Sequence, residues 1–352
     1  MRVVVNGWFW EQIATGSGQY LAGLAAWLPQ AGPEHERIMV TPRGQKSSVR
    51  HSVLSCSTAA GPRLAPLGVP ACGVAVYRRA GWQTVAAPTP FDGLSRNLAK
   101  LWFEQVAFPR ACRRLHADVA LVPYWGSPWW QPCPTVVTVH DLIPLLLPLY
   151  RGGLLQRAYT GLVSRTVRRA HAVLADSEAG RQDIIAHLNI PPERVHAVHL
   201  AVDPGFSPVT DVETLDRVRE KHALPDGPFL LYMGGFDARK NVTRMLQGYA
   251  QVVKGETARG TGLGREIRLV VAGTLPGKDT AFKPDPAILA ERLGIRDRVS
   301  FIGWVDEADK PALYSMALAA LYLSAYEGFG LPVLEAMGCG CAVIAASSPG
   351  TT

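Results

Sequence analysis

The sequence predicts an α/β protein of two domains built around parallel β-sheets. The chain has 352 residues, which is too long for one ordinary hydrophobic core, so two domains are expected. In the first half, short apolar runs alternate with helical patterns, which is the order typical of a parallel sheet. In the second half a new buried strand pattern begins at Phe229, and further strand patterns follow it.

The composition describes a globular chain and leaves the class of partner open. Hydrophobic residues make up 48% of the chain and charged residues 18%. No run approaches about eighteen uninterrupted apolar residues, so no transmembrane helix is expected. The N-terminus begins directly with a strand pattern, and we do not expect a signal peptide. The formal net charge of +7 suits nucleic acid, an acidic membrane surface or a phosphorylated ligand.

The six cysteines show neither a C-x-x-C pair nor a metal-ligand spacing with histidine. This pattern is typical of reduced thiols in a cytoplasmic protein. Cys339 and Cys341, separated by one glycine, permit redox chemistry, but two small residues entering a buried strand are the favoured interpretation.

The first strand and helix enclose a glycine-containing loop. Residues 2–6 predict a strand, and helically spaced apolar residues predict a helix over 18–28. The loop between them ends at Gly16 and Gly18, which invites a dinucleotide-binding interpretation. That interpretation fails because the third glycine of G-x-G-x-x-G would fall at Leu21, and because the loop is too long for the required tight turn.

Residues 97–115 predict an amphipathic helix that is interrupted at Pro109. Its apolar side is bordered by basic residues, which are Arg96, Lys100, Arg110, Arg113 and Arg114. This is the composition of a helix at a membrane interface, and a plain surface helix of the sheet is an equal alternative. Residues 42–95, which precede it, show weak periodicity and receive no assignment.

Two strands of the first half end at residues suited to a binding site. Residues 117–122 predict a strand, and the aromatic run 124–130 follows its carboxyl end, where open α/β sheets bind ligands. That run could form the floor of a site for a sugar or a lipid, or could only cover the sheet edge. Residues 135–139 predict the next strand, which ends at His140 and Asp141, a pair placed for chemistry. The remaining strands and helix of this half are predicted at 172–176, 195–200 and 178–187.

A basic turn follows the strand predicted at 229–235. Gly235 ends that strand, Arg239 and Lys240 come next, and a helix is predicted from about Val242. A compact backbone, two cations and a helix N-terminus together suit a phosphate group, and a simple charged turn is the alternative. Further strands are predicted at 267–272, 299–304, 319–323 and 342–346.

The stretch 324–338 combines a glycine-containing loop with a helix that begins near Pro332, since proline is favoured in the first helical turn. Unpaired backbone N–H groups at such a helix start suit an anion. Glu327 in the loop and Glu335 in the helix add carboxylates, which bind hydroxyl groups strongly. The stretch therefore predicts a site for a ligand that carries both phosphates and hydroxyls. A buried turn with two solvated glutamates is the alternative.

The pattern Glu327-x7-Glu335, in the setting Tyr-Glu-Gly-Phe-Gly-Leu-Pro-Val-Leu-Glu-Ala-Met, resembles the signature of the retaining glycosyltransferases of family 4. The segments beginning at His140 and at Gly234, and the segment 201–206, are also similar to that family. The resemblance implies a GT-B fold, in which two Rossmann-like domains face each other across a cleft. It places an acceptor-side domain at 1–206, a linker at 207–228 and a nucleotide-sugar domain at 229–352. Since family members normally continue further, the second domain is expected to be incomplete at its C-terminus.

The same resemblance implies roles for individual residues. His140 would face the transferred sugar, Arg239 and Lys240 would neutralise the diphosphate, Glu327 would bind a sugar hydroxyl, and Glu335 would bind the ribose. We expect the catalytic residues to be His140, Arg239, Lys240 and Glu327. We expect the donor-binding residues to be Gly16, Gly18, Gly235, Glu327, Gly328, Phe329, Gly330, Leu331 and Glu335. No Asp-x-Asp occurs in the chain, so neither a metal nor another cofactor is expected.

The resemblance is greatest to bacterial mannosyltransferases of surface-polysaccharide assembly. It implies transfer of a hexose, with mannose from GDP-mannose as the first candidate, to a glycan or a lipid-linked acceptor. The expected location is the cytoplasm, with peripheral contact to the anionic inner face of the plasma membrane. The alternatives are a GT-B epimerase or phosphorylase and a catalytically silent sugar-binding protein. Nucleic acid is not expected as a partner, because the basic residues are scattered and no recognised motif occurs.

Overall fold

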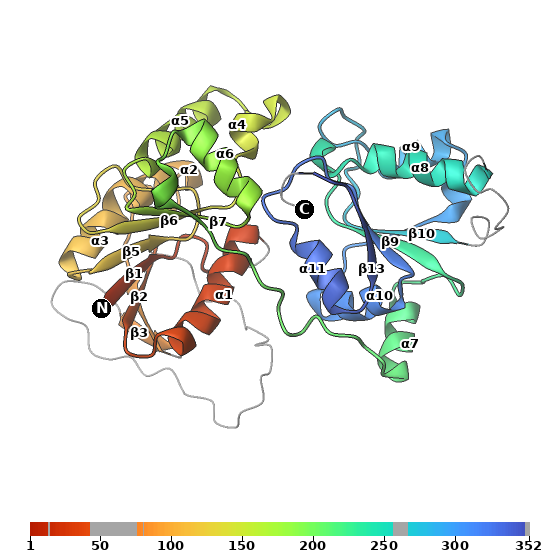
Figure 1. Cartoon of the computed structure of the whole chain (residues 1–352), viewed down its shortest axis with the longest axis horizontal. Coiled ribbons are helices and arrows are strands. Elements are labelled where there is room, and N and C mark those ends of the chain that lie inside the picture. Colours follow the sequence, from red (N-terminus) through yellow and green to blue (C-terminus); the bar gives the residue numbers. More distant parts are fainter. Residues whose placement is uncertain (13–14, 43–75, 80, 256–266, 349–352) are drawn as a thin grey trace. The chain divides into compact units, whose positions relative to one another are not determined.

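We analysed a computed structural model of the whole chain, in which residues 1–12, 15–42, 76–79, 81–255 and 267–348 are described. The chain divides into two compact units (Figure 1). The first comprises 1–145, 151–176 and 181–198, and the second comprises 146–150, 177–180 and 199–352. Within the described part of the chain, no helix is both long enough and apolar enough to cross a membrane.

The first unit contains an eight-stranded sheet with the order β3-β4-β2-β1-β5-β6-β7-β8. Neighbouring strands are parallel except for β3 and β4, which are antiparallel. The strands are β1 (Arg2–Asn6), β2 (Glu36–Thr41), β3 (Val76–Arg79), β4 (Trp82–Ala86), β5 (Val119–Val122), β6 (Thr135–Val139), β7 (Ala172–Ala175) and β8 (Val195–Ala197). The predicted parallel sheet is therefore confirmed.

Six α-helices connect these strands within the described residues. They are α1 (Gly16–Ala31), α2 (Arg96–Trp102), α3 (Phe108–Arg114), α4 (Ile143–Leu146), α5 (Leu154–Val167) and α6 (Glu178–Leu188). Short helical turns lie at Phe103–Ala107, Pro148–Tyr150 and Pro192–Arg194. The side chain of Thr15 caps α1 by accepting a hydrogen bond from the Gly18 N–H at 3.1 Å, which explains why the helix begins at this loop.

The helix predicted at 97–115 is continuous, and its irregular turn lies before Pro109 rather than at it. Residues Phe103–Ala107 form a π-helical turn between α2 and α3. Proline has no N–H to donate to the carbonyl four residues earlier, so the preceding turn widens. Part of the apolar side faces the core: Phe103 and Phe108 are fully buried, while Leu98 is 49% exposed. This burial favours the plain surface helix of the sheet over a helix at a membrane interface.

The second unit contains a five-stranded, fully parallel sheet with the order β11-β10-β9-β12-β13. Its strands are β9 (Phe229–Met233), β10 (Arg268–Ala272), β11 (Val299–Gly303), β12 (Ala319–Tyr322) and β13 (Ala342–Ala345). Its helices are α7 (Val212–Lys221), α8 (Val242–Lys254), α9 (Pro286–Arg292), α10 (Lys310–Met316) and α11 (Leu331–Gly338), with short turns η4 (Ala238–Lys240), η6 (Arg296–Arg298) and η7 (Glu307–Asp309). All five strands predicted in this half are confirmed to within two residues at each end.

Both faces of this second sheet are covered by helices, as a parallel sheet requires (Figure 1). On one face Leu231 and Val270 pack with Leu313 of α10. On the other face Val271 packs with Leu246 of α8. Successive strand residues point to opposite faces, so one short strand such as β10 supplies both cores.

Helix α7 lies within the segment predicted as a linker and is tied to the second unit by an ionic cluster. Asp309 is buried and lies 3.1 Å from Arg217 Nη2, 2.6 Å from Lys221 Nζ and 3.2 Å from His222 Nε2. Burial alone would raise the pKa of Asp309. Hydrogen bonds from Lys221, His222 and Arg217 outweigh burial and hold this pKa at about 2. The cluster therefore fastens the start of the second unit to α10.

We predict that Asp309→Asn lowers the free energy of unfolding by about 2 kcal/mol at pH 7. The pKa of Asp309 is depressed in the folded state, so its contribution is present above the unfolded pKa of about 4 and disappears as the pH falls towards 2. Urea denaturation at neutral and acidic pH measures this difference. Asp306→Asn is the matched control, because Asp306 pairs with the same Lys221 at 2.8 Å but its side chain is 64% exposed. Equal losses in the two variants would contradict the assignment.

Candidate functional site

The polar loops of the second unit meet because the strands that precede them are neighbours. β9 pairs directly with β12, and parallel strands end at the same edge of their sheet. The turn after β9 and the loop after β12 therefore lie side by side. The Ala325 N–H donates to the Arg239 carbonyl at 2.8 Å and joins the two segments. The sequence predicted both segments, and the sheet order brings them together.

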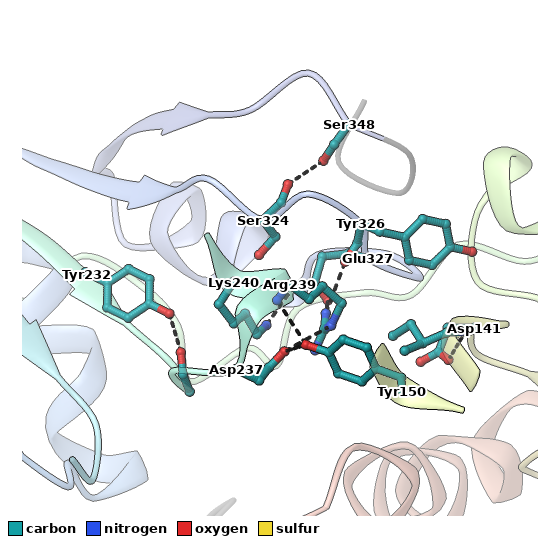
Figure 2. A network of polar contacts seen from close by, with 12 residues as sticks. Asp141, Tyr150, Tyr232, Asp237, Arg239, Lys240, Ser324, Tyr326, Glu327 and Ser348 are labelled. Carbon is teal, nitrogen blue, oxygen red and sulfur yellow. Dashed lines mark hydrogen bonds and ion pairs between the residues drawn. The ribbon is translucent and has the colours of Figure 1, made fainter. Parts of the chain in front are cut away.

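Arg239, Lys240 and Glu327 form one ionic cluster at this edge (Figure 2). Lys240 Nζ lies 2.7 Å from Glu327 Oε1, while Arg239 Nη1 pairs with Glu327 Oε2. The three side chains are only 11–17% exposed. Burial would raise the pKa of Glu327, but the charges of Lys240 and Arg239 outweigh burial and lower it. The structure thus unites three of the four predicted catalytic residues.

Arg239 is fixed by further contacts within the second unit (Figure 2). Its guanidinium donates to the Tyr326 carbonyl at 3.1 Å, and its backbone N–H donates to the Tyr150 hydroxyl at 2.9 Å. Tyr150 also donates to Asp237, which forms an ion pair with Arg239 Nε at 3.5 Å. Arg239 Nε is buried, and the geometry of this ion pair does not make a hydrogen bond. Tyr150 was not predicted, because it lies far away in the sequence and only the fold reveals it.

The start of helix α11 has the geometry predicted for anion binding. Gly330 has a φ of +96°, a left-handed conformation that favours glycine, and immediately precedes Leu331. Among the described residues, no side chain caps this end of the helix. Pro332 has no N–H and the Val333 N–H donates to the Gly330 carbonyl at 2.9 Å, so the Leu331 N–H is the group of this first turn that can meet a ligand. In the preceding loop, the Gly328 carbonyl accepts from Ser177 Oγ at 2.8 Å, and the ring centroids of Phe329 and His199 lie 6.1 Å apart.

Glu335 lies in the second turn of α11 and belongs to a different environment from Glu327. Burial raises the pKa of Glu335, whereas Lys310 lowers it less strongly. The Tyr314 hydroxyl lies 3.4 Å from Glu335 Oε2. Within the described part of the chain no lysine or arginine forms an ion pair with Glu335, and Lys310 pairs with Glu307 instead. This carboxylate is therefore suited to accept hydrogen bonds from neutral hydroxyl groups.

The predicted glycines occupy three different settings. Gly235 follows β9, and its carbonyl accepts a hydrogen bond from the Tyr232 hydroxyl. Gly16 is the first residue of α1, where a Cβ would meet open space. At Gly18 a Cβ would lie 2.0 Å from the Gln12 carbonyl oxygen, so only glycine fits there. The close approach at Gly18 is a packing requirement, and donor binding by Gly16, Gly18 and Gly235 stays a prediction.

In the first unit, His140 pairs with a residue that the sequence analysis did not select. His140 Nδ1 lies 2.8 Å from Asp176 Oδ2, and His140 Nε2 lies 3.2 Å from the Pro123 carbonyl. Asp141, the predicted partner, instead accepts from the Ile143 N–H at 3.0 Å. Burial alone would lower the pKa of His140, but the hydrogen bond and charge of Asp176 raise it overall. Val139 of β6 is paired with Ala175 of β7, so residues 140 and 176 lie side by side. Aligning these two predicted strands would have identified Asp176 as the partner of His140.

The aromatic run 124–130 divides between core and surface. Tyr124 is buried and donates to Asn6 Oδ1 at 3.1 Å, whereas Trp129 and Trp130 are exposed. Trp125 is half-buried, and its indole N–H has no partner among the described residues. Covering the sheet edge therefore applies to Tyr124, whereas Trp129 and Trp130 are exposed enough to form the floor of a binding site.

Beside this run lies a buried carboxylate that the sequence analysis missed. Glu104 belongs to the π-helical turn, is fully buried and accepts from the Tyr159 hydroxyl at 3.0 and 3.1 Å. Lys100 lies 3.6 Å from it and 4.8–5.4 Å from the ring centroids of Phe9, Tyr124 and Tyr159. Burial, only partly offset by Lys100 and the tyrosines, raises the pKa of Glu104 to about 7. The sequence signal for this buried pair was a single glutamate within an apolar helical face, four residues after a lysine.

We predict that Glu104 makes the protein less stable as the pH rises from about 5 to 8. The folded state binds this proton more tightly than the unfolded state, whose pKa is near 4.5, so folding loses stability between pH 4.5 and 7. The difference in unfolding free energy between the parent and Glu104→Gln should therefore change by up to about 3 kcal/mol across this range. Denaturation at several pH values measures it. A constant difference would show that the pKa of Glu104 is the same in the folded and unfolded states.

Comparison with known proteins agrees with this geometry. The model of Glycosyltransferase Family 4 matches residues 14–206, and that of Glycosyl transferases group 1 matches residues 216–352. The O-antigen chain mannosyltransferase B of Escherichia coli is 31% identical over 209 residues, covering 59% of this chain and 52% of that protein. The serotype-specific mannosyltransferase WbdA of Escherichia coli is 30% identical over 228 residues, covering 63% of this chain and 26% of that protein. The chain thus spans about half or less of the length of these relatives.

Solved structures share the fold. Sucrose-phosphate synthase from Thermosynechococcus elongatus aligns with a TM-score of 0.67 at 19% identity, covering 99% of this chain and 82% of that one. HepE from Anabaena, solved with UDP and glucose, aligns with a TM-score of 0.59 at 14% identity, covering 99% and 82%. These similarities confirm the predicted GT-B fold class. Since the first family model matches more than half of the residues, the chain belongs to glycosyltransferase family 4.

Proposed function

We propose that the protein transfers a hexose from a nucleotide-sugar donor to a glycan or lipid-linked acceptor, with retention of anomeric configuration. The observation that carries the proposal is the cluster of Arg239 and Lys240 on the single carboxylate Glu327. This cluster lies in the same unit as the uncapped start of α11. Two cations and a free helix N-terminus suit a diphosphate, and nearby carboxylates suit sugar hydroxyls.

The cluster also supplies a chemical rationale for the transfer. The departing nucleoside diphosphate must be stabilised while positive charge develops on the sugar. Arg239 and Lys240 are held in place before the reaction, so they stabilise that charge without reorganising. Glu327 pairs with both cations, and Asp237 also pairs with Arg239. A bound diphosphate would replace Glu327 as the counter-charge of Arg239 and Lys240. Glu327 would then be released to bind a sugar hydroxyl. We propose that these residues act without a divalent metal.

His140 is proposed to orient the sugar rather than to remove a proton. Both of its ring nitrogens face hydrogen-bond acceptors, the Asp176 carboxylate and the Pro123 carbonyl. That arrangement favours the doubly protonated ring, which cannot act as a base. In the same proposal, Glu335 binds the ribose hydroxyls, because it is a partly buried carboxylate that lacks a strong cationic partner.

Mannose is the proposed sugar and GDP-mannose the proposed donor. The support comes from the names of the relatives, which include an O-antigen chain mannosyltransferase and a serotype-specific mannosyltransferase. Incubation of the protein with GDP-mannose, UDP-glucose and UDP-galactose should show slow hydrolysis that is fastest with GDP-mannose. Faster hydrolysis of a UDP-sugar would replace the proposed donor. Release of a free nucleotide-sugar isomer would indicate an epimerase instead.

We predict that Lys240→Ala lowers kcat for the preferred donor by about 10²–10³, since it removes a preorganised group that acts mainly in the transition state. Glu335→Ala should instead raise the donor KM with little change in kcat, because ribose contacts are equal in the ground and transition states. Steady-state donor hydrolysis separates the two effects. EDTA should change neither.

Lys254→Ala is the matched control, because Lys254 is an exposed lysine at the end of α8. It should behave like the parent. If Lys240→Ala kept full activity, or if EDTA abolished hydrolysis, the proposed role of the two cations would be wrong.

A further inference from the structure

The strongest unexplained feature outside the site is the surface at the start of helix α5. Leu154 and Leu155 are 83% and 88% exposed, although they are adjacent leucines in a well-formed helix. Arg151 and Arg157, on either side of them, are exposed as well. We name these four residues the leucine–arginine surface. Folding does not require these leucines, since neither contributes to the core.

The charge of this region has one sign. From Leu142 to Ala175 the sequence contains no aspartate and no glutamate, but it contains five arginines. All five are exposed, at positions 151, 157, 165, 168 and 169. Among the residues that the structure describes, no carboxylate forms an ion pair with any of them. A charged surface without internal compensation is complementary to an anionic partner.

The position of the surface follows from the topology of the first unit (Figure 1). The chain leaves the carboxyl end of β6 at His140, passes through α4 and enters α5 at Leu154. Helix α5 then runs back to the opposite edge, where β7 begins at Ala172. The leucine–arginine surface therefore lies towards the sheet edge that carries His140.

We infer that the leucine–arginine surface docks on a bilayer containing anionic lipid. Exposed leucines beside arginines match an interface in which the apolar side chains enter the acyl boundary and the guanidinium groups stay among the headgroups. The helix 96–114 presents less apolar surface, because Phe103 and Phe108 are fully buried and Leu98 is only 49% exposed. This inference rests on the proposed function, since docking here would turn the edge with His140 towards a lipid-linked acceptor.

The test is co-sedimentation of the full chain with vesicles of phosphatidylcholine, alone or mixed with phosphatidylglycerol. The parent should bind the anionic vesicles, and binding should weaken with salt. L154S/L155S should lower the partition coefficient by at least about tenfold. R151S/R157S should lower it by about fivefold per arginine on the anionic vesicles. Circular dichroism checks that each variant is folded.

Two controls separate this surface from others. L94S/L98S removes two exposed leucines elsewhere in the first unit, and R110S/R113S/R114S removes the basic residues of α3. Both should bind vesicles like the parent. The inference is overturned if the parent does not bind, if the controls lose as much binding as the test variants, or if L154S/L155S only alters self-association.

Hydrolysis of the preferred nucleotide-sugar in solution distinguishes this inference from the proposed function. L154S/L155S should keep the parent rate, because its leucines do not belong to the donor site. Vesicle binding without any donor hydrolysis would leave docking intact and remove the proposed function. Donor hydrolysis without vesicle binding would support the proposed function and overturn the docking inference.

Discussion

The pairing of β9 with β12 is the constraint on which the candidate donor site depends. Because these parallel strands are neighbours, the turn with Arg239 and Lys240 meets the loop with Glu327. Two cations so little exposed would be costly without a counter-charge. Glu327 supplies that counter-charge, and its short side chain is replaceable by a ligand phosphate. A carboxylate within an anion site looks contradictory in the sequence, but here it compensates part of the positive charge of Arg239 and Lys240.

The strands of the second sheet were predictable because they are short apolar runs. The central strands β10 and β12 are buried on both faces, whereas the edge strand β13 is largely exposed. Other elements were missed for physical reasons. β2 contains Arg37, a buried cation whose guanidinium donates to the Gly32 carbonyl, so its pattern looks less apolar than its environment. In α5 the apolar residues lie on both sides of the helix, with Val163 buried and Leu154 exposed, so no single face stands out. Helix α7 has few apolar residues, and it is held both by Val218 in the core and by the Asp309 cluster.

In the candidate site, the residues of contiguous motifs were predictable, and the partners that come from distant segments were not. The basic turn and the Glu-x7-Glu loop are contiguous in the sequence, and the predicted residues lie where the motifs place them. The partners Asp176 of His140 and Tyr150 of Arg239 come from other segments. Sequence alone favoured Asp141 because it is adjacent. In an extended chain, however, adjacent side chains point to opposite sides, and the partner comes from the next strand.

Long-range polar contacts connect distant segments of the first unit. Asn6 Oδ1 accepts a hydrogen bond from Tyr124, Glu104 accepts one from Tyr159, and His140 pairs with Asp176. Asn6 Nδ2 and the Trp125 indole N–H have no hydrogen-bond partner among the described residues. The leucines at the start of α5 differ from these groups, because no packing or hydrogen bonding within the first unit accounts for them. Exposed apolar side chains that packing within their own unit does not account for are the part of the surface that an external partner must explain.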